Sequence, residues 1–140
     1  MLLRAVISLT AGRGEVAWPL VLSRGFIPHV VQGHELATRI AGLSTPTLDV
    51  IRSHHECWNG SGYPDGLAGT DIPLSARIFA VCDVYDALIS ERPYKKAWSH
   101  EDAVLEIERQ SGQHFDPDVV RAFLSLMEVG KRIEPQPCAL

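Results

Sequence analysis

Hydrophobic residues recur every three or four positions along the chain from residue 29 onward, which is the spacing of one face of a helix. In the first such stretch the positions on one face are Val30, Leu36, Ile40 and Leu43. Four later stretches repeat the pattern, and the five together predict helices over 29–43, 44–56, 74–90, 100–112 and 116–127. Their short connections favour an all-α domain.

Start and stop signals support the second and fourth of these helices. Thr45 is the expected N-cap of the second helix, because Pro46 would then occupy the first helical position. Ser99 and Asp102 have the spacing of a capping box at the start of the fourth helix. Gly112 is expected to close that helix.

The third helix is preceded by a loop. Residues 59–73 hold four glycines and two prolines, a composition that breaks regular structure. The helix that follows is expected to place one apolar stripe along its length, formed by Leu74, Ile78, Val81, Tyr85 and Leu88.

The two ends of the chain do not fit the helical pattern. Residues 1–28 are expected to form an irregular or strand-like leader, and their apolar runs are too short to span a bilayer. Arg4 lies inside the first run, which also disfavours a secretion signal. The last helix is expected to open at Asp116 and Pro117 and to end at Met127, with residues 131–140 as a flexible tail.

Composition narrows the class of protein. The chain has 140 residues, of which 46% are hydrophobic and 21% charged, so a single globular domain is expected. A net charge of −4 favours neither a nucleic-acid polymer nor an anionic membrane as partner. The three cysteines are odd in number and form no CxxC pair, which indicates a cytoplasmic protein.

Neighbouring histidines suggest a metal site. His54 and His55 stand near the expected end of the second helix, displaced by about 100° from each other around its axis. That displacement would suit two ions, or one ion and a supporting contact. Asp83 could bridge two ions and His29 could complete the group. Surface histidines and a solvated aspartate are the alternative interpretation.

A basic turn follows the third helix. Arg92 and Lys95 are three residues apart with Tyr94 between them, so a guanidinium fork and an ammonium could bind a phosphate while the ring stacks on a base. A solvated basic turn, favoured by the helix dipole, is the alternative.

A family resemblance covers residues 29 to about 128. The segments that carry it are "HVVQGHELATRI", "HHECWNGSGYPDG", "IPLSARI", "DVYDAL", "RPYK" and "GQHFDPDVVRAFL". They resemble the HD-GYP family of cyclic di-GMP phosphodiesterases. The loop 59–73 contains the Gly-Tyr-Pro sequence and is called the GYP loop below. His34 and Asn59 stand where the family often has tyrosine and aspartate.

The resemblance implies an HD-type helical bundle that hydrolyses cyclic di-GMP at two or three divalent ions, usually iron or manganese. It implies that His29, His54, His55 and Asp83 are metal ligands. Arg92 and Lys95 would hold the substrate, and Lys95 would also offset charge on the reacting phosphate. Tyr63 would flank the substrate in a loop that also binds partners such as GGDEF-type signalling proteins.

One family feature is missing. No histidine of this chain is followed by aspartate, and the expected place of that pair is taken by "AGRGEVAWPLVLSRGFIP". Residues 29–130 are therefore expected to be the C-terminal portion of an HD-GYP domain, truncated on its N-terminal side and exposing apolar surface. Three hypotheses follow: a working phosphodiesterase, a non-catalytic cyclic-di-GMP-binding or interaction module, or a gene remnant.

Overall fold

The regular secondary structure of the described residues is helical. The computed structural model describes residues 27–91 and 96–133, and within these ranges it contains α-helices, one short 3₁₀ turn and no β-strand. The elements are α1 (Ile27–Ala37), α2 (Thr45–Ser53), η1 (Gly69–Asp71), α3 (Leu74–Ile89), α4 (His100–Arg109) and α5 (Pro117–Ile133). The predicted all-α class is confirmed.

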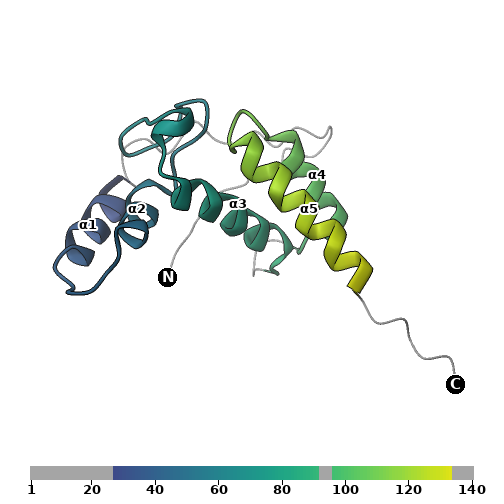
Figure 1. Cartoon of the computed structure of the whole chain (residues 1–140), viewed down its shortest axis with the longest axis horizontal. Helices are drawn as coiled ribbons and strands as arrows, with labels where there is room; N and C mark the ends of the chain where they lie inside the picture. The colour runs from purple at the N-terminus through teal and green to yellow at the C-terminus, as the bar shows by residue number, and fades with distance from the viewer. Residues whose placement is uncertain (1–26, 92–95, 134–140) are drawn as a thin grey trace, which may run out of the picture.

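Helix α3 connects two helix pairs. Figure 1 shows α1 and α2 side by side on one side of α3, and α4 and α5 side by side on the other. The core lies where α3 meets the second pair, and its buried members are Ala80, Val81, Ile107, Phe115, Val120 and Phe123. An ion pair between Arg77 and Asp116 ties the start of α3 to the start of α5.

The end of α1 and the N-cap of α2 differ from the prediction. Helix α1 ends at Ala37 because the next amides bond three residues back, Arg39 to Leu36 and Ile40 to Ala37, and Gly42 then adopts a φ of 91°. The predicted extension to residue 43 was wrong. Ser44, and not Thr45, is the N-cap of α2, since its backbone is extended and its carbonyl accepts the first helical bond, from Leu48.

The later helices follow the sequence signals more closely. Ser99 caps α4, accepting a hydrogen bond from the Asp102 amide as the capping box predicts. Helix α4 ends at Arg109, three residues before Gly112. Helix α5 begins at Pro117 but continues through Gly130 to Ile133, so the predicted end at Met127 was wrong. A single glycine costs a helix only about 1 kcal/mol, which neighbouring turns can offset.

Part of the predicted apolar face is exposed. Val81 and Leu88 of the α3 stripe are buried, but Leu74 and Ile78 are 54% and 46% exposed. Leu36 and Ile40 are also exposed. The first turns of α3 thus present apolar surface. None of the described helices combines the length and the apolar content needed to cross a membrane.

Candidate metal centre

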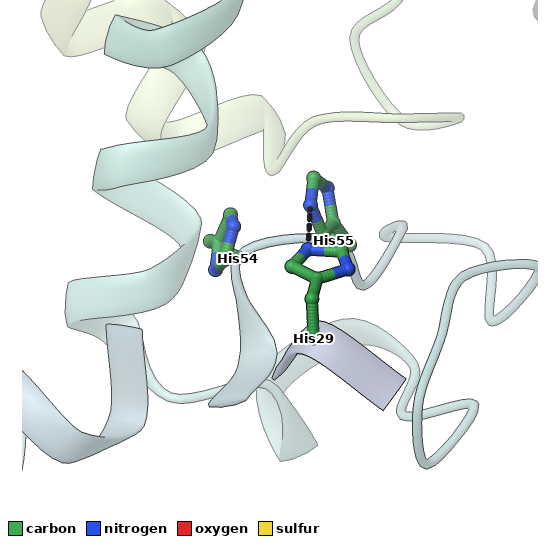
Figure 2. A group of neighbouring side chains, drawn as sticks. All are labelled: His29, His54 and His55. Carbon is green, nitrogen blue, oxygen red and sulfur yellow. Dashed lines mark hydrogen bonds between the residues drawn. The ribbon is translucent and has the colours of Figure 1, made fainter. Parts of the chain in front are cut away.

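Three histidines from two helices meet in the described part of the chain. His29 lies in the first turn of α1, while His54 is the C-cap of α2 and His55 follows it. Each offers a ring nitrogen, and the three nitrogens lie within 4.8 Å of one another. Figure 2 shows the rings of His29 and His55 pointing at each other, with His54 beside them. We call His29, His54 and His55 the three-histidine group.

The spacing within the group suits one coordination shell. The Nε2 atoms of His29 and His55 are 3.3 Å apart. Two imidazole nitrogens bound at about 2.1 Å to one tetrahedral ion are about 3.4 Å apart, and ligands on opposite sides of an ion are about 4.2 Å apart. The histidines therefore fit a divalent cation by their spacing and by their donor chemistry.

The two adjacent histidines lie beyond the helix that precedes them. Helix α2 ends at Ser53, and His54 and His55 form the turn that follows it. The ring centroids of His54 and His55 are 4.0 Å apart. The predicted helix over 44–56 therefore extended three residues too far, and both rings lie in one group of ligand atoms.

A backbone carbonyl orients His54. The Nδ1 atom of His54 lies 2.7 Å from the carbonyl oxygen of Val50. A carbonyl can only accept, so Nδ1 carries the proton and the Nε2 lone pair can bind a cation. A metal-binding histidine that donates its other N–H to a carbonyl is a common arrangement, because that bond fixes both the tautomer and the ring.

His55 is held in its neutral form. Burial, and to a smaller extent charge on His54, His29 and His114, lower the pKa of His55 to about 3. Its imidazole is therefore neutral near pH 7, with one ring nitrogen free of a proton, which is the form that binds a metal ion. The ring of Tyr63 stacks on that of His55, with centroids 4.9 Å apart. Tyr63 thus lies beside the three-histidine group, and its expected contact with substrate stays a prediction.

Of the predicted ligands that the structure describes, Asp83 is not part of this group. Asp83 is half-buried on α3, one turn after Phe79, whose ring meets that of His54 at 5.7 Å. Its carboxylate is not one of the gathered ligand atoms, so its role as a ligand stays a prediction. Arg92 and Lys95 lie outside the described residues.

The start of the GYP loop contacts the segment that joins α4 to α5. This polar contact was not predicted from the sequence. The amides of Trp58 and Asn59 donate to the carbonyls of His114 and Gln113, at 3.1 and 3.0 Å. The Asn59 side chain bonds Gln113 as well, and its Oδ1 accepts from Ser61. The "GQHFDPDVVRAFL" segment thus supports the loop that follows the histidines.

Cys57 belongs to this contact and is not an activated nucleophile. Its Sγ lies 3.3 Å from Nδ1 of His114. Burial raises the pKa of the Cys57 thiol and lowers the pKa of His114 to about 4, so both groups are neutral near pH 7. A neutral thiol is a poor nucleophile, and the pair is therefore structural.

Glu56 is the other residue that sequence reasoning passed over. It follows the two histidines directly, yet the residue is only 3% exposed. Its carboxylate accepts hydrogen bonds from backbone amides of the GYP loop. The adjacent glycines and Pro64 were the only signal in the sequence of a loop at this position.

Comparison with known proteins shows which family the chain belongs to. A sequence model described as HD domain matches residues 27–119. The chain belongs to the HD domain family. Its relatives place it in the HD-GYP branch. It is 52% identical over 94 residues to a probable cyclic di-GMP phosphodiesterase of Vibrio cholerae, covering 64% of this chain and 21% of that protein. It is 44% identical over 101 residues to a cyclic di-GMP phosphodiesterase of Pseudomonas aeruginosa, covering 72% of this chain and 24% of that protein.

A solved structure gives the same result for the fold. The crystal structure of a cyclic GMP-AMP-specific phosphodiesterase of Vibrio cholerae superimposes with a TM-score of 0.63 at 32% sequence identity, covering 73% of this HD domain chain and 23% of that chain. The chain thus spans between a fifth and a quarter of the length of these relatives. HD domain phosphohydrolases are metal-dependent, which agrees with the expected divalent cofactor.

Proposed function

We propose that this chain carries part of the metal centre and the substrate-binding turn of a cyclic di-GMP phosphodiesterase. The three-histidine group is the observation that carries the proposal, because its nitrogens lie within 4.8 Å of one another beside a family-specific loop. Iron or manganese is the expected ion. A bound divalent cation supplies a water whose pKa is low enough to yield hydroxide near neutral pH.

The proposed roles of the chain's own residues are to hold the cation and to bind the substrate. His29, His54 and His55 hold the cation, with His54 oriented by the Val50 carbonyl. The expected role of Arg92 and Lys95 is to bind the phosphate and to offset the charge that develops on its oxygens during in-line attack. Asp83 would add a carboxylate ligand from α3.

The substrate is proposed from the relatives and from the basic turn. Two of the relatives described above are named for cyclic di-GMP and one for cyclic GMP-AMP. We choose cyclic di-GMP because the two relatives named for it are 52% and 44% identical to this chain, against 32% for the structure named for cyclic GMP-AMP. The expected setting is the cytoplasm, with GGDEF-type signalling proteins as partners of the GYP loop.

A non-catalytic binding module is the second candidate. The observation in its favour is that the ligand group of the described residues contains histidines alone. The sequence also lacks a histidine followed by aspartate. Without a bridging carboxylate, two cations would repel each other strongly, so binding of one ion without turnover would follow.

The test combines metal content with turnover. The full chain is purified, loaded anaerobically with Fe(II) or Mn(II), and analysed for bound metal and for hydrolysis of cyclic di-GMP, with cyclic GMP-AMP as a second substrate. His55→Ala removes a proposed ligand, and His34→Ala is the matched control, since His34 lies on α1 outside the three-histidine group.

Metal binding with turnover that His55→Ala abolishes and His34→Ala preserves supports the phosphodiesterase. Binding of metal and cyclic di-GMP without turnover supports the binding module. A chain that binds neither, or whose metal content is the same in wild type and His55→Ala, contradicts the proposal, and the gene remnant would then remain.

A further inference from the structure

Glu56 is a buried carboxylate whose partners are backbone amides. One oxygen accepts from the amides of Asp65 and Gly66, at 2.7 and 3.1 Å, and the other accepts from Leu67 at 3.1 Å. Hydrogen bonds to an ionised acceptor are stronger than neutral ones, and successive amides aimed at one point form an anion-binding concavity. Here the anion is a side chain of the same chain.

The three amides can converge only if the loop reverses direction. Gly66 adopts a φ of 68°, a conformation that side-chain-bearing residues rarely reach. The carboxylate therefore fixes the backbone of residues 65–67 and not merely one side chain.

The same loop segment returns to the backbone beside the histidines. A Cβ built on Gly62 would lie 2.3 Å from the Cys57 nitrogen and 2.4 Å from the Glu56 Cα. Only glycine fits this approach. The next residue, Tyr63, donates its amide to the His55 carbonyl at 3.2 Å and stacks its ring on the His55 ring at 28° between planes.

A second, more exposed contact attaches the loop to α2. The guanidinium of Arg52 makes two hydrogen bonds to the Asp65 carboxylate, at 2.8 and 2.7 Å. Both side chains are about one-third exposed, so solvent weakens this pair. The buried Glu56 contact is the stronger of the two attachments.

We infer that Glu56 is a positioning residue that holds the GYP loop so that Tyr63 stays stacked on His55, and thereby fixes His55 for binding a metal ion. The metal part of this inference rests on the proposed function. The loop part rests on the hydrogen bonds of Glu56 and stands without metal.

The experiment compares Glu56→Ala and Glu56→Gln with wild type. The glutamine oxygen can keep the bonds to Asp65 and Gly66, but its NH₂ group cannot accept from Leu67, so its effects are expected to be intermediate. Glu106→Gln is the matched control, since Glu106 is a second buried glutamate, on α4, bonded to Arg109 and Gln110.

Two measurements are made on each full-length variant. The first, on metal-free protein, is amide hydrogen exchange of residues 65–67 together with the ring-proton NMR shifts of His55, which the stacked Tyr63 ring displaces. The second is the dissociation constant for Mn(II). Circular dichroism reports whether the helices persist.

In Glu56→Ala we expect faster exchange at residues 65–67, loss of the ring-current displacement at His55 and an Mn(II) dissociation constant raised by about tenfold or more. The same three readouts in Glu56→Gln are expected to lie between those of Glu56→Ala and wild type. If Glu56→Ala does not fold, the comparison of Glu56→Gln with wild type tests the inference. Glu106→Gln is expected to leave all three readouts at wild-type values.

Wild-type exchange and His55 shifts in both Glu56 variants would overturn the inference. So would the same changes in Glu106→Gln, because they would then reflect general loosening of the fold. A wild-type chain that binds no Mn(II) would count against the proposed function, while the exchange and shift measurements would still decide the role of Glu56.

Discussion

The ring of Tyr63 lies stacked on the ring of His55, with centroids 4.9 Å apart and 28° between the planes. The two residues are eight positions apart and are joined by a backbone hydrogen bond from the Tyr63 amide to the His55 carbonyl. This contact links the GYP loop to the three-histidine group. It also supplies part of the burial that keeps His55 neutral.

Removing the Tyr63 ring should therefore raise the pKa of His55. Burial is the main reason that this pKa is lowered to about 3. In metal-free Tyr63→Ala we expect it to move toward the ordinary value of 6.5, while Tyr63→Phe, which keeps the stacked ring, should leave it low. An NMR titration of the His55 ring protons measures both. Equal pKa values in the two variants would show that Tyr63 does not shield His55.

The metal-free protein should lose stability as the pH falls from 6.5 toward 4. Burial lowers the pKa of His114 from 6.5 to about 4, so between these values the unfolded chain binds a proton that the folded chain does not. Stability therefore rises with pH across this window, by up to about 3 kcal/mol from His114. His55 acts in the same direction.

Urea unfolding at several pH values measures this slope. His114→Asn keeps a polar group near Cys57 but takes up no proton, so its free energy of unfolding should vary less between pH 6.5 and 4 than that of wild type. Identical slopes would exclude His114 as a source of the pH dependence.

A methyl group at Gly62 should detach the GYP loop. Its Cβ would lie 2.3–2.4 Å from backbone atoms of Glu56 and Cys57, which cannot move without breaking the loop. Gly62→Ala is expected to lower the free energy of unfolding by about 1–3 kcal/mol.

Gly33→Ala is the natural control for that substitution. A Cβ at Gly33 would meet only Ile51 Cγ2, at an ordinary 3.6 Å, inside α1. It should stabilise the chain by up to about 1 kcal/mol, because alanine is the better helix former. If both variants moved stability in the same direction, the close approach at Gly62 would not be the cause.

The ion pair between Arg77 and Asp116 should matter far more than an exposed one. Asp116 is 3% exposed, and its other oxygen accepts from the Asp118 amide at the start of α5. Arg77→Ala would leave that carboxylate buried without its cation and should cost about 3–5 kcal/mol.

The matched comparison is Arg121→Ala, which breaks the exposed pair with Asp118 and should cost at most about 1 kcal/mol. Chemical denaturation of both variants separates the two cases. Similar losses would mean that the burial of Asp116 adds nothing to the strength of its pair.

Features set by neighbouring residues could be predicted from the sequence. The Ser99 cap and the start of α5 at Pro117 were correct because the signals lie within one turn of the element. The predicted end of α2 was wrong: the helix stops at Ser53, and Glu56, which was expected to be helical, is instead bound through its carboxylate by amides 9 to 11 residues later. No periodicity of the chain encodes that contact.

In the candidate site, too, residue types could be predicted from the sequence, but contacts between distant residues could not. The histidine pair and His29 could be singled out as metal-binding residue types, but their mutual geometry depended on where α2 ends. The exposure of Leu74 and Ile78 could not be read from an apolar stripe, because spacing identifies a face and not what covers it. The positions of Asp83, Arg92 and Lys95 in the site remain predictions.

The most direct measurement of the central claim is X-ray absorption by the full chain loaded anaerobically with Fe(II). The account predicts imidazole nitrogens at about 2.1 Å from the ion, with the contribution of one imidazole lost in His55→Ala and none lost in His34→Ala. A spectrum that contains oxygen ligands alone, and that neither substitution changes, would contradict the three-histidine group as a metal site.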